Sequence, residues 1–168
     1  MLINGKNLRR LVMTALLAAL VTVFNAFIGH IPLPGATGEY LHFGDSLIYL
    51  AACLLPGPCA VLAGALGAGL ADLLTSAVYA IPTVIIKTCI ALCFSAKREK
   101  ILCPRNALAL LPAAGITLGG YFLASCVLTN WRAALLTLPF NLLQAAGSAA
   151  VFVLLALAMD RAGLKKRI

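Results

Sequence analysis

Three ionisable residues of this sequence stand in or beside long apolar runs, where a charge is costly. Asp45 begins one run, Asp72 lies inside the next, and Lys87 lies inside a third. An ionisable side chain at membrane depth costs at least about 2.5–3.5 kcal/mol, so such residues face the interior of a helix bundle and pair with one another, with backbone groups or with a ligand. We therefore interpret the three residues as candidates for a buried site that binds a small polar molecule.

A second group of polar residues lies in the last apolar run. Asn141, Gln144 and Ser148 are three and four residues apart, which places them on one stripe of a helix. A buried amide without a hydrogen-bond partner costs about 1–3 kcal/mol. These side chains are therefore expected either to join neighbouring helices or to bind a ligand, and both roles stay open.

Membrane helices are the elements that must position these side chains. Of the 168 residues, 62% are hydrophobic and only 11% are charged, so the chain is far more apolar than a soluble domain of this size. A helix of about 20 apolar residues spans the hydrocarbon core. We predict an all-α integral membrane protein, a single domain over residues 1–168 that forms a bundle of six transmembrane helices. The expected helices cover residues 8–28, 45–55, 59–78, 82–96, 107–128 and 135–159.

The basic residues predict how the bundle is oriented. The net charge is +8, and eleven of the thirteen Lys and Arg residues lie between or beyond the apolar runs. Loops rich in Lys and Arg stay in the cytoplasm, so both termini are expected there, with Lys87 and Arg132 as exceptions. A nucleic-acid-binding protein would instead gather its basic residues on one water-exposed face, so we expect no nucleic-acid partner. The clusters are Lys6, Arg9 and Arg10; Lys97, Arg98, Lys100 and Arg105; and Arg161, Lys165, Lys166 and Arg167.

The longest predicted connection, residues 29–44, is expected on the outer side and is long enough to act as a lid. Its glycines and prolines break helices. It also supplies polar and aromatic side chains from His30, Glu39, Tyr40 and His42. Asp45 follows where a helix N-cap would stand, so its carboxylate is expected either to cap that helix or to belong to the site.

The third expected helix carries a face of small residues that ends in an acid. Ala60, Gly64, Ala68 and Asp72 share this face by their four-residue spacing, so it must pack tightly against a neighbour. Asp72 and Asp45 are expected at nearly the same depth, with Lys87 close to it. We predict that Lys87 faces inward and pairs with a polar group, rather than extending outward to the interface.

The six cysteines include no C-x-x-C pair, and most lie within apolar runs. We interpret them as small hydrophobic residues. Cys89 and Cys93 are one helical turn apart, but no His or carboxylate nearby completes a metal site. We therefore predict neither a bound metal nor a cofactor.

Taken in order, these segments resemble the substrate-binding S components of energy-coupling factor (ECF) vitamin transporters, in particular the riboflavin-type and vitamin-precursor branch. The resemblance covers nearly the whole chain. It depends on the order and spacing of several pieces together. They are the basic N-terminus with Ala15 and Ala19, His42 to Asp45, Leu70 to Leu73, Pro82 to Lys87, and Pro139 to Gln144.

The resemblance implies a subunit of the bacterial or archaeal cytoplasmic membrane that binds a vitamin-like molecule from outside. Its partners would be a transmembrane coupling subunit and two ATP-binding-cassette ATPase subunits. The chain has no G-x-x-x-x-G-K-[ST] phosphate loop, which agrees with ATP hydrolysis in those partners and with a non-enzymatic role. The implied roles are partner docking for Ala15 and Ala19; substrate binding for Lys87, Asn141, Gln144, His42 and Tyr40; and organisation of the loop and outer rim for Asp45 and Asp72.

The chemistry of these residues suits a small polar heterocycle that forms several hydrogen bonds. Riboflavin, a pyrimidine precursor, a pyridoxine-like ring and a modified purine base all fit. Transport of cobalt or nickel is disfavoured, because that branch of the family carries a His after Met1 and this chain has Leu2.

Two other classes of protein are alternatives. A metal-dependent membrane enzyme would gather His30, His42, Asp45 and Asp72 into an outer metal or acid-base site, although the sequence has no H-E-x-x-H pair. A stand-alone secondary transporter would need internal repeats and an ion site, and no repeat is evident.

Overall fold

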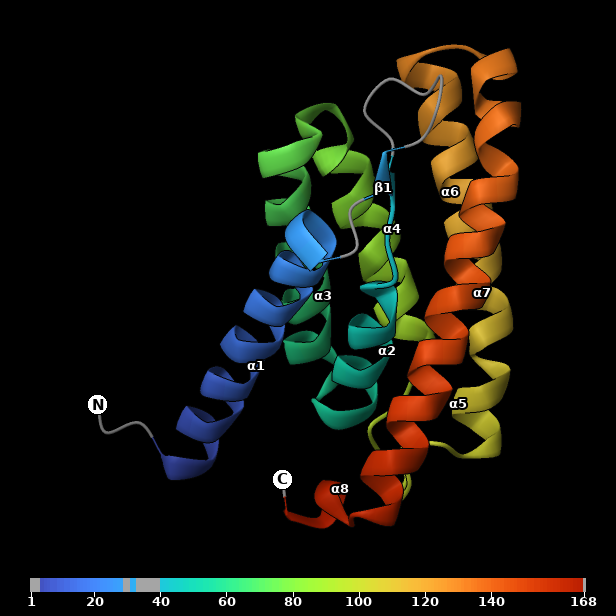
Figure 1. The fold of residues 1–168 in the computed structure, drawn as a ribbon. Coiled ribbons are helices and arrows are strands. Elements are labelled where there is room, and N and C mark those ends of the chain that lie inside the picture. The colour runs from blue at the N-terminus through green and yellow to red at the C-terminus, as the bar shows by residue number, and fades with distance from the viewer. Residues whose placement is uncertain (1–3, 29–30, 33–39, 168) are drawn as a thin grey trace.

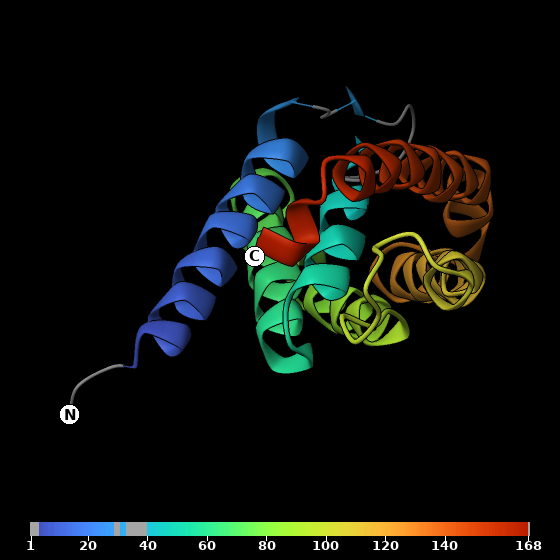
Figure 2. The ribbon, with the colours of Figure 1, turned by 90° about the horizontal axis from the view of Figure 1, so that it is seen from below.

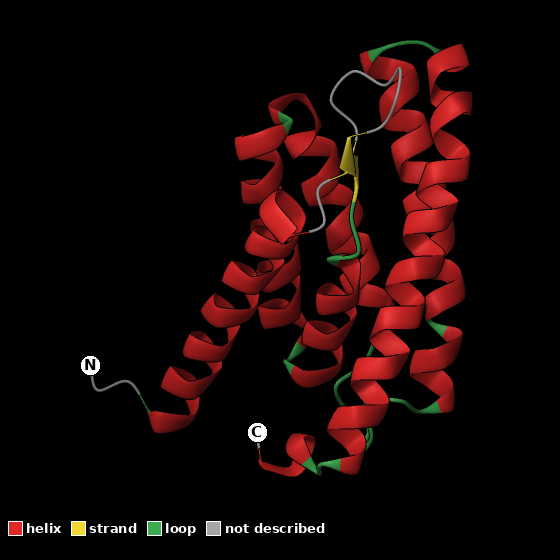
Figure 3. Ribbon diagram, in the orientation of Figure 1, coloured by secondary structure: helices red, strands yellow, loops and turns green. Residues whose placement is uncertain are grey.

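The computed structural model describes residues 4–28, 31–32 and 40–167. The predicted loop residues Gly29, His30, Pro34, Gly35, Gly38 and Glu39, together with Leu2, lie outside the described residues. The described elements are helices and one short β-hairpin (Figures 1 and 3). They are α1 (Gly5–Val23), η1 (Phe24–Ile28), β1 (Ile31–Pro32), β2 (Tyr40–Leu41), α2 (Asp45–Leu54), α3 (Gly57–Thr75), η2 (Ala77–Tyr79), α4 (Ala80–Cys93), α5 (Pro104–Leu108), α6 (Leu110–Leu128), α7 (Trp131–Arg161) and α8 (Leu164–Arg167).

Within the described residues, four helices are long and apolar enough to cross a membrane. They cover Gly5–Ile28, Gly57–Thr75, Pro104–Leu128 and Trp131–Arg161. Two shorter apolar helices, Asp45–Leu54 and Ala77–Cys93, accompany them. The predicted all-α membrane fold is confirmed to this extent.

The long helices pack around the short helix α2. Each of the surrounding helices contacts the next: α1 packs on α3, α3 on α4, α4 on α6 and α6 on α7. The short helix α2 contacts α1, α3, α4 and α7. Figure 1 shows both termini at one end of the bundle, which we call the terminal end; the hairpin extends toward the opposite end, the hairpin end. Seen from the terminal end in Figure 2, α2 lies between α3 and α7. Residues Asp45–Cys53 of α2 are all buried, as expected for a central element.

The short helix α2 occupies only the half of the bundle near the terminal end. Extended chain precedes it: β1 and β2 pair antiparallel, with Ile31 opposite Leu41 and Pro32 opposite Tyr40. In Figure 1 this hairpin lies in front of α4 and beside α7, with which β2 makes contacts, and leads directly down into α2. Near the hairpin, the interior therefore receives side chains from this extended segment, such as the buried His42, as well as from the surrounding helices.

Three aromatic rings fix α2 against its neighbours in the terminal half. Tyr49 of α2 stacks on Phe94, with ring centroids 4.8 Å apart, and Phe152 of α7 meets both rings edge-on at 5.7 Å. All three side chains are buried. Aromatic pairs contribute about 0.5–1.5 kcal/mol each beyond the area they bury, so this cluster anchors α2 firmly.

The connection from α4 to α6 is held by two side chains. Asn106 accepts the N–H of Ser95 and donates to the carbonyls of Ser95 and Ile101, over distances of 3.0–3.1 Å. Asp160, near the end of α7, accepts the N–H groups of Ile101 and Leu102 at 2.8 and 2.9 Å. The last turns of α7 are therefore tied to this connection at the terminal end.

Helix α7 starts before the expected position. The side chain of Asn130 accepts the N–H of Ala133, so Asn130 caps the helix and Trp131 is its first residue. Pro139 is accommodated inside the helix, which continues for 31 residues.

Helices α1 and α3 cross at close range through small residues. The predicted small face of α3 is buried, with Ala60 and Ala68 at 1% and 0% exposure. At the crossing, the Thr22 hydroxyl donates to the carbonyl of Gly67 over 2.9 Å. A Cβ on Gly67 would lie 2.6 Å from the Ala18 carbonyl oxygen and 2.8 Å from Val21 Cβ. Only a residue without a side chain fits here.

Gly67→Ala is therefore expected to destabilise the bundle by about 1–3 kcal/mol, because the added methyl meets backbone that cannot move aside. Thermal unfolding of the purified chain in detergent measures this as a lower midpoint. Gly119→Ala is the matched control, since a Cβ there meets nothing within 4 Å, and it is expected to leave stability unchanged or raise it. Equal behaviour of the two variants would contradict the close crossing.

Candidate functional site

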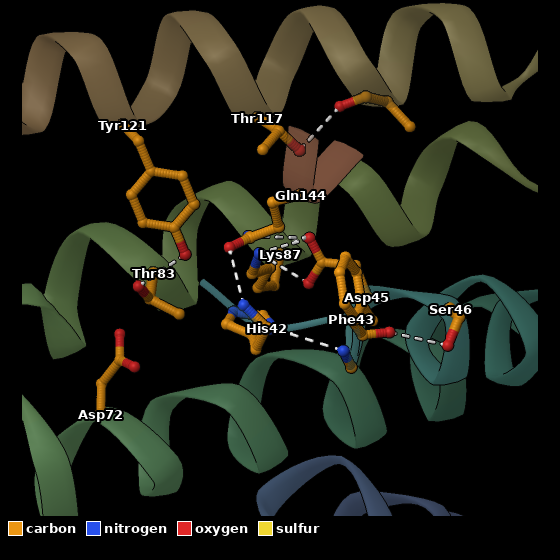
Figure 4. A network of polar contacts seen from close by, with 12 residues as sticks. His42, Phe43, Asp45, Ser46, Asp72, Thr83, Lys87, Thr117, Tyr121 and Gln144 are labelled. Carbon is orange, nitrogen blue, oxygen red and sulfur yellow. Dashed lines mark hydrogen bonds and ion pairs between the residues drawn. The ribbon is translucent and has the colours of Figure 1, made fainter. Parts of the chain in front are cut away.

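An ion pair lies at the centre of the bundle. Lys87 of α4 places its Nζ 2.7 Å from Oδ1 and 2.9 Å from Oδ2 of Asp45, the first residue of α2. Both side chains are 0% exposed. The prediction that Lys87 faces inward and is paired is confirmed, and its partner is Asp45, as Figure 4 shows.

The alternative that Asp45 caps its own helix is wrong. The N-cap of α2 is Gly44, and no side chain makes a capping hydrogen bond. The Asp45 carboxylate instead faces Lys87 and Gln144. Leaving the buried Lys87 ammonium without a counter-charge would cost about 3–5 kcal/mol, whereas losing a helix N-cap costs about 0.5–2 kcal/mol. The Asp45 carboxylate therefore pairs with Lys87 instead of capping its helix.

Gln144 of α7 connects the ion pair to the segment below the hairpin. Its Nε2 lies 3.5 Å from Oδ2 of Asp45, and its Oε1 accepts the backbone N–H of His42 at 3.3 Å. The ring of His42 in turn accepts the Gly44 N–H at Nδ1, over 3.2 Å. Helices α2, α4 and α7 and the segment that enters α2 therefore share one polar network (Figure 4).

Two glycines let the segment 42–44 lie close to its neighbours. The ring of Phe43 packs against Gly147 of α7, where a Cβ would come within 2.2 Å of the ring. Gly44 lies against Asn25, and a Cβ there would overlap the Asn25 side-chain oxygen at 1.6 Å. Sequence reasoning missed Asn25 and Gly147. Asn25 did carry a signal, as a lone amide in an otherwise apolar run.

Asp72 does not pair with Lys87; it holds the hairpin. The hydroxyl of Tyr40 in β2 donates to Oδ1 of Asp72 on α3 over 2.5 Å. Burial, and then the charge of Asp72, raise the pKa of the Tyr40 phenol well above its ordinary value. Tyr40 therefore stays protonated and remains a donor at neutral pH. Figure 4 shows Asp72 apart from the Lys87 and Asp45 pair.

A small cavity lies between the hairpin and the helices. Its volume is about 20 Å³, enough for about one water molecule. Five of the predicted site residues line it, together with two tyrosines. The lining residues are Tyr40, His42, Asp72, Tyr79, Tyr121, Asn141 and Gln144.

The two tyrosines of the lining were not predicted as site residues. Tyr121 of α6 hydrogen-bonds Thr83 of α4 over 3.0 Å, and its ring centroid lies 5.0 Å from the Lys87 Nζ. Tyr79 lies 3.4 Å from Ser125. Tyrosine in a membrane helix is ordinarily read as an interface residue, so only the helix rotations reveal that these two rings turn inward.

The remaining predicted residues lie as follows. Asn141 is buried and its Nδ2 is 3.5 Å from Thr137 of the same helix. Ala15 and Ala19 are exposed on α1, away from its crossing with α3. Among the residues that the structure describes, no group of three His, Cys, Asp or Glu could hold a metal ion.

A bundle of apolar helices around a cavity lined by polar side chains is typical of a multi-pass membrane protein that binds a small polar molecule. Residues 5–161 match the family model described as "ECF-type riboflavin transporter, S component", and the chain belongs to this family. No curated protein matches the chain. The chain is therefore a substrate-binding subunit of a transporter, not an enzyme, and its family associates with the coupling and ATPase components of ECF transporters.

Removing either partner of the central pair is expected to destabilise the protein strongly. Lys87→Met leaves the Asp45 carboxylate buried without a counter-charge, and Asp45→Asn does the same to the ammonium, so each costs about 3–5 kcal/mol. The double variant Asp45→Asn/Lys87→Met removes both charges and is expected to cost much less than the two single losses together. The unfolding midpoints of the unmodified protein, the two single variants and the double variant, measured in detergent, give the coupling free energy between the two side chains. Additive losses would contradict a direct pair.

Proposed function

We propose that the chain captures a small polar vitamin or vitamin precursor from outside a bacterial cell, as the binding subunit of an ATP-driven ECF importer. The observation that carries this proposal is the polar cavity lined by side chains of β2, His42, α3, η2, α6 and α7. Membership of the S-component family supports the transport role.

The lining of the cavity favours an uncharged or cationic ring that is not phosphorylated. Three tyrosines offer aromatic faces, and the amides of Asn141 and Gln144 offer donors and acceptors for ring heteroatoms. The positive charge of Lys87 is already compensated by Asp45, whereas the lining itself contains the acid Asp72. A phosphate ester would therefore meet no unbalanced cation and one carboxylate.

Ligand entry requires the hairpin to move, because the cavity has room for about one water molecule. Among the described residues, the contacts that must break include the bond from Tyr40 to Asp72 and the bond from the His42 N–H to Gln144. A single ring displaces less of the hairpin than a three-ring flavin does. We therefore favour a pyrimidine-type or pyridoxine-type ring over riboflavin.

The proposed topology has six spans with both termini in the cytoplasm. The four long helices and the two shorter apolar ones supply the spans. The three basic clusters stand at the beginning of α1, between α4 and α6, and at the end of α7, which supports a cytoplasmic terminal end. The hairpin then faces outward, where the substrate arrives.

Ala15 and Ala19 are proposed to dock on the transmembrane coupling subunit, which works with two ATPase subunits. Both alanines are exposed on α1, and an A-x-x-x-A pair lets a second helix approach closely. The exposed side chains around them are apolar, as with Leu16 at 54% exposure.

A ligand panel on the purified chain in detergent tests the function. Pyrimidine precursors, pyridoxine forms, riboflavin and other B vitamins, and modified purine bases are compared with their phosphorylated counterparts by thermal stability. A ligand at a hundred times its dissociation constant adds about 2.7 kcal/mol to the stability of the folded state. We expect one unphosphorylated single-ring compound to stabilise the protein, and its phosphate ester to have no effect.

The same assay locates the site. Asn141→Ala is expected to weaken binding of the hit about tenfold, because it removes one amide partner of the ligand. Ser148→Ala is the matched control, since Ser148 lies on the same buried stripe but does not line the cavity. Stabilisation only by phosphorylated compounds would contradict the proposed ligand class. Equal affinity of the Asn141→Ala and Ser148→Ala variants for the ligand would contradict the proposed site.

Bulk on the proposed docking face is expected to block assembly. Ala15→Trp/Ala19→Trp should retain ligand binding but lose co-purification with the coupling subunit. Ala146→Trp/Ala150→Trp is the matched control, because these alanines form an exposed pair with the same spacing on α7. Undiminished co-purification of the α1 variant would contradict the docking assignment.

A further inference from the structure

A second, larger cavity lies at the terminal end, far from the polar site. Its volume is about 690 Å³. Helix α1 crosses α3 at Gly67 and then, toward its N-terminus, diverges from α2 and α3 (Figures 1 and 2). The cavity opens in this fork, between the first turns of α1, the turn from α2 to α3 and the end of α4.

The rim of this cavity is strongly basic. Lys6, Arg9 and Arg10 of α1 and Lys97 after α4 all line it and are all exposed. Of the described residues that line the cavity, none is acidic. Four cations on one side of a cavity, without a carboxylate among the lining residues, favour an anionic occupant.

The beginning of α3 adds to this positive potential. Pro56, Gly57 and Ala60 line the cavity, so the N-terminal end of a 19-residue helix opens into it. No side chain caps this end, and its first turn contains no acidic residue. The first N–H groups of a helix lack partners within the helix and attract negative charge.

The floor of the cavity is apolar. Ala52 and Leu55 at the end of α2, and Ala91 and Phe94 at the end of α4, lie beneath the basic rim and are buried. An occupant must therefore combine an anionic group with an apolar body. A soluble anion satisfies only the rim, whereas a lipid whose phosphate lies at the helix ends satisfies both.

We propose that this cavity binds one anionic phospholipid, with its phosphate between the basic side chains and its glycerol and upper acyl chains against the apolar floor. Basic pockets between the ends of membrane helices bind lipid headgroups in this way. The site lies next to the first turns of α1, so the bound lipid would steady the fork between α1 and α3. This proposal does not depend on the identity of the transported molecule.

Native mass spectrometry of the purified full chain tests the proposal, after exchange into mixed micelles that contain phosphatidylglycerol and phosphatidylcholine in equal amounts. We expect one retained phosphatidylglycerol per chain. Lys6→Ala/Arg10→Ala/Lys97→Ala should reduce the preference for phosphatidylglycerol by about tenfold or more, because each basic residue adds to the attraction. Arg9 stays unchanged, since it makes a polar or electrostatic interaction within the protein.

The matched control removes the same number of charges outside the cavity. Arg98, Lys100 and Arg161 are exposed at the same end and do not line it, so Arg98→Ala/Lys100→Ala/Arg161→Ala should retain the preference. Equal loss in both triple variants would overturn the site in favour of diffuse attraction. Displacement of the lipid by millimolar glycerol phosphate would show that a free anion suffices. If no lipid is retained and Lys97 cross-links to a carboxylate of a co-purified coupling subunit, the proposal is overturned, and the cavity is then a binding surface for that subunit.

Discussion

The structure depends on the compensation of one buried positive charge. Lys87 lies at 0% exposure inside the bundle, where an unpaired ammonium is not tolerated, and Asp45 supplies the opposite charge. Because Asp45 is the first residue of α2, the pair also fixes where α2 begins and which neighbours it meets. The half of the bundle beyond that point contains extended chain instead of a central helix. The polar cavity lies there, and Tyr40 and His42 of the extended segment line it together with polar side chains from α3, η2, α6 and α7.

The strong contact between helices and the weaker contacts of the hairpin lie in different parts of the bundle. The ion pair joins two helices and is enclosed by them, so it belongs to the scaffold. The hairpin is held by weaker links, chiefly the hydrogen bond from Tyr40 to Asp72 and the bond from His42 to Gln144. Hydrogen bonds of this kind contribute about 0.5–3 kcal/mol each, much less than the loss of a buried charge partner. We therefore propose that the hairpin opens by breaking these hydrogen bonds while the ion pair stays intact.

The sequence predicted the helices, the inward orientation of Lys87 and the buried small face of α3, because each follows from local spacing or from the cost of burying a charge. It did not predict which acid Lys87 meets, since Asp45 and Asp72 were expected at the same depth and only the rotation of each helix distinguishes them. The inward tyrosines, the contact of Phe43 with Gly147 and the basic cavity likewise arise from tertiary packing. The ligand roles of Asn141, Gln144, His42 and Tyr40 stay predictions.

The length of α7 has a mechanical consequence. Its 31 residues extend about 46 Å, well beyond the thickness of about 30 Å of the hydrocarbon core. Gln144 and Asp160 lie about 24 Å apart along this rod. Gln144 accepts a hydrogen bond from the backbone N–H of His42 in the segment below the hairpin. Asp160 accepts hydrogen bonds from the backbone N–H groups of Ile101 and Leu102. A tilt of about 5° around Gln144 would move the Asp160 end by about 2 Å, by the geometry of a rod with the helical rise. A tilt of α7 on opening of the hairpin would therefore also shift the connection between α4 and α6 at the opposite end of the bundle.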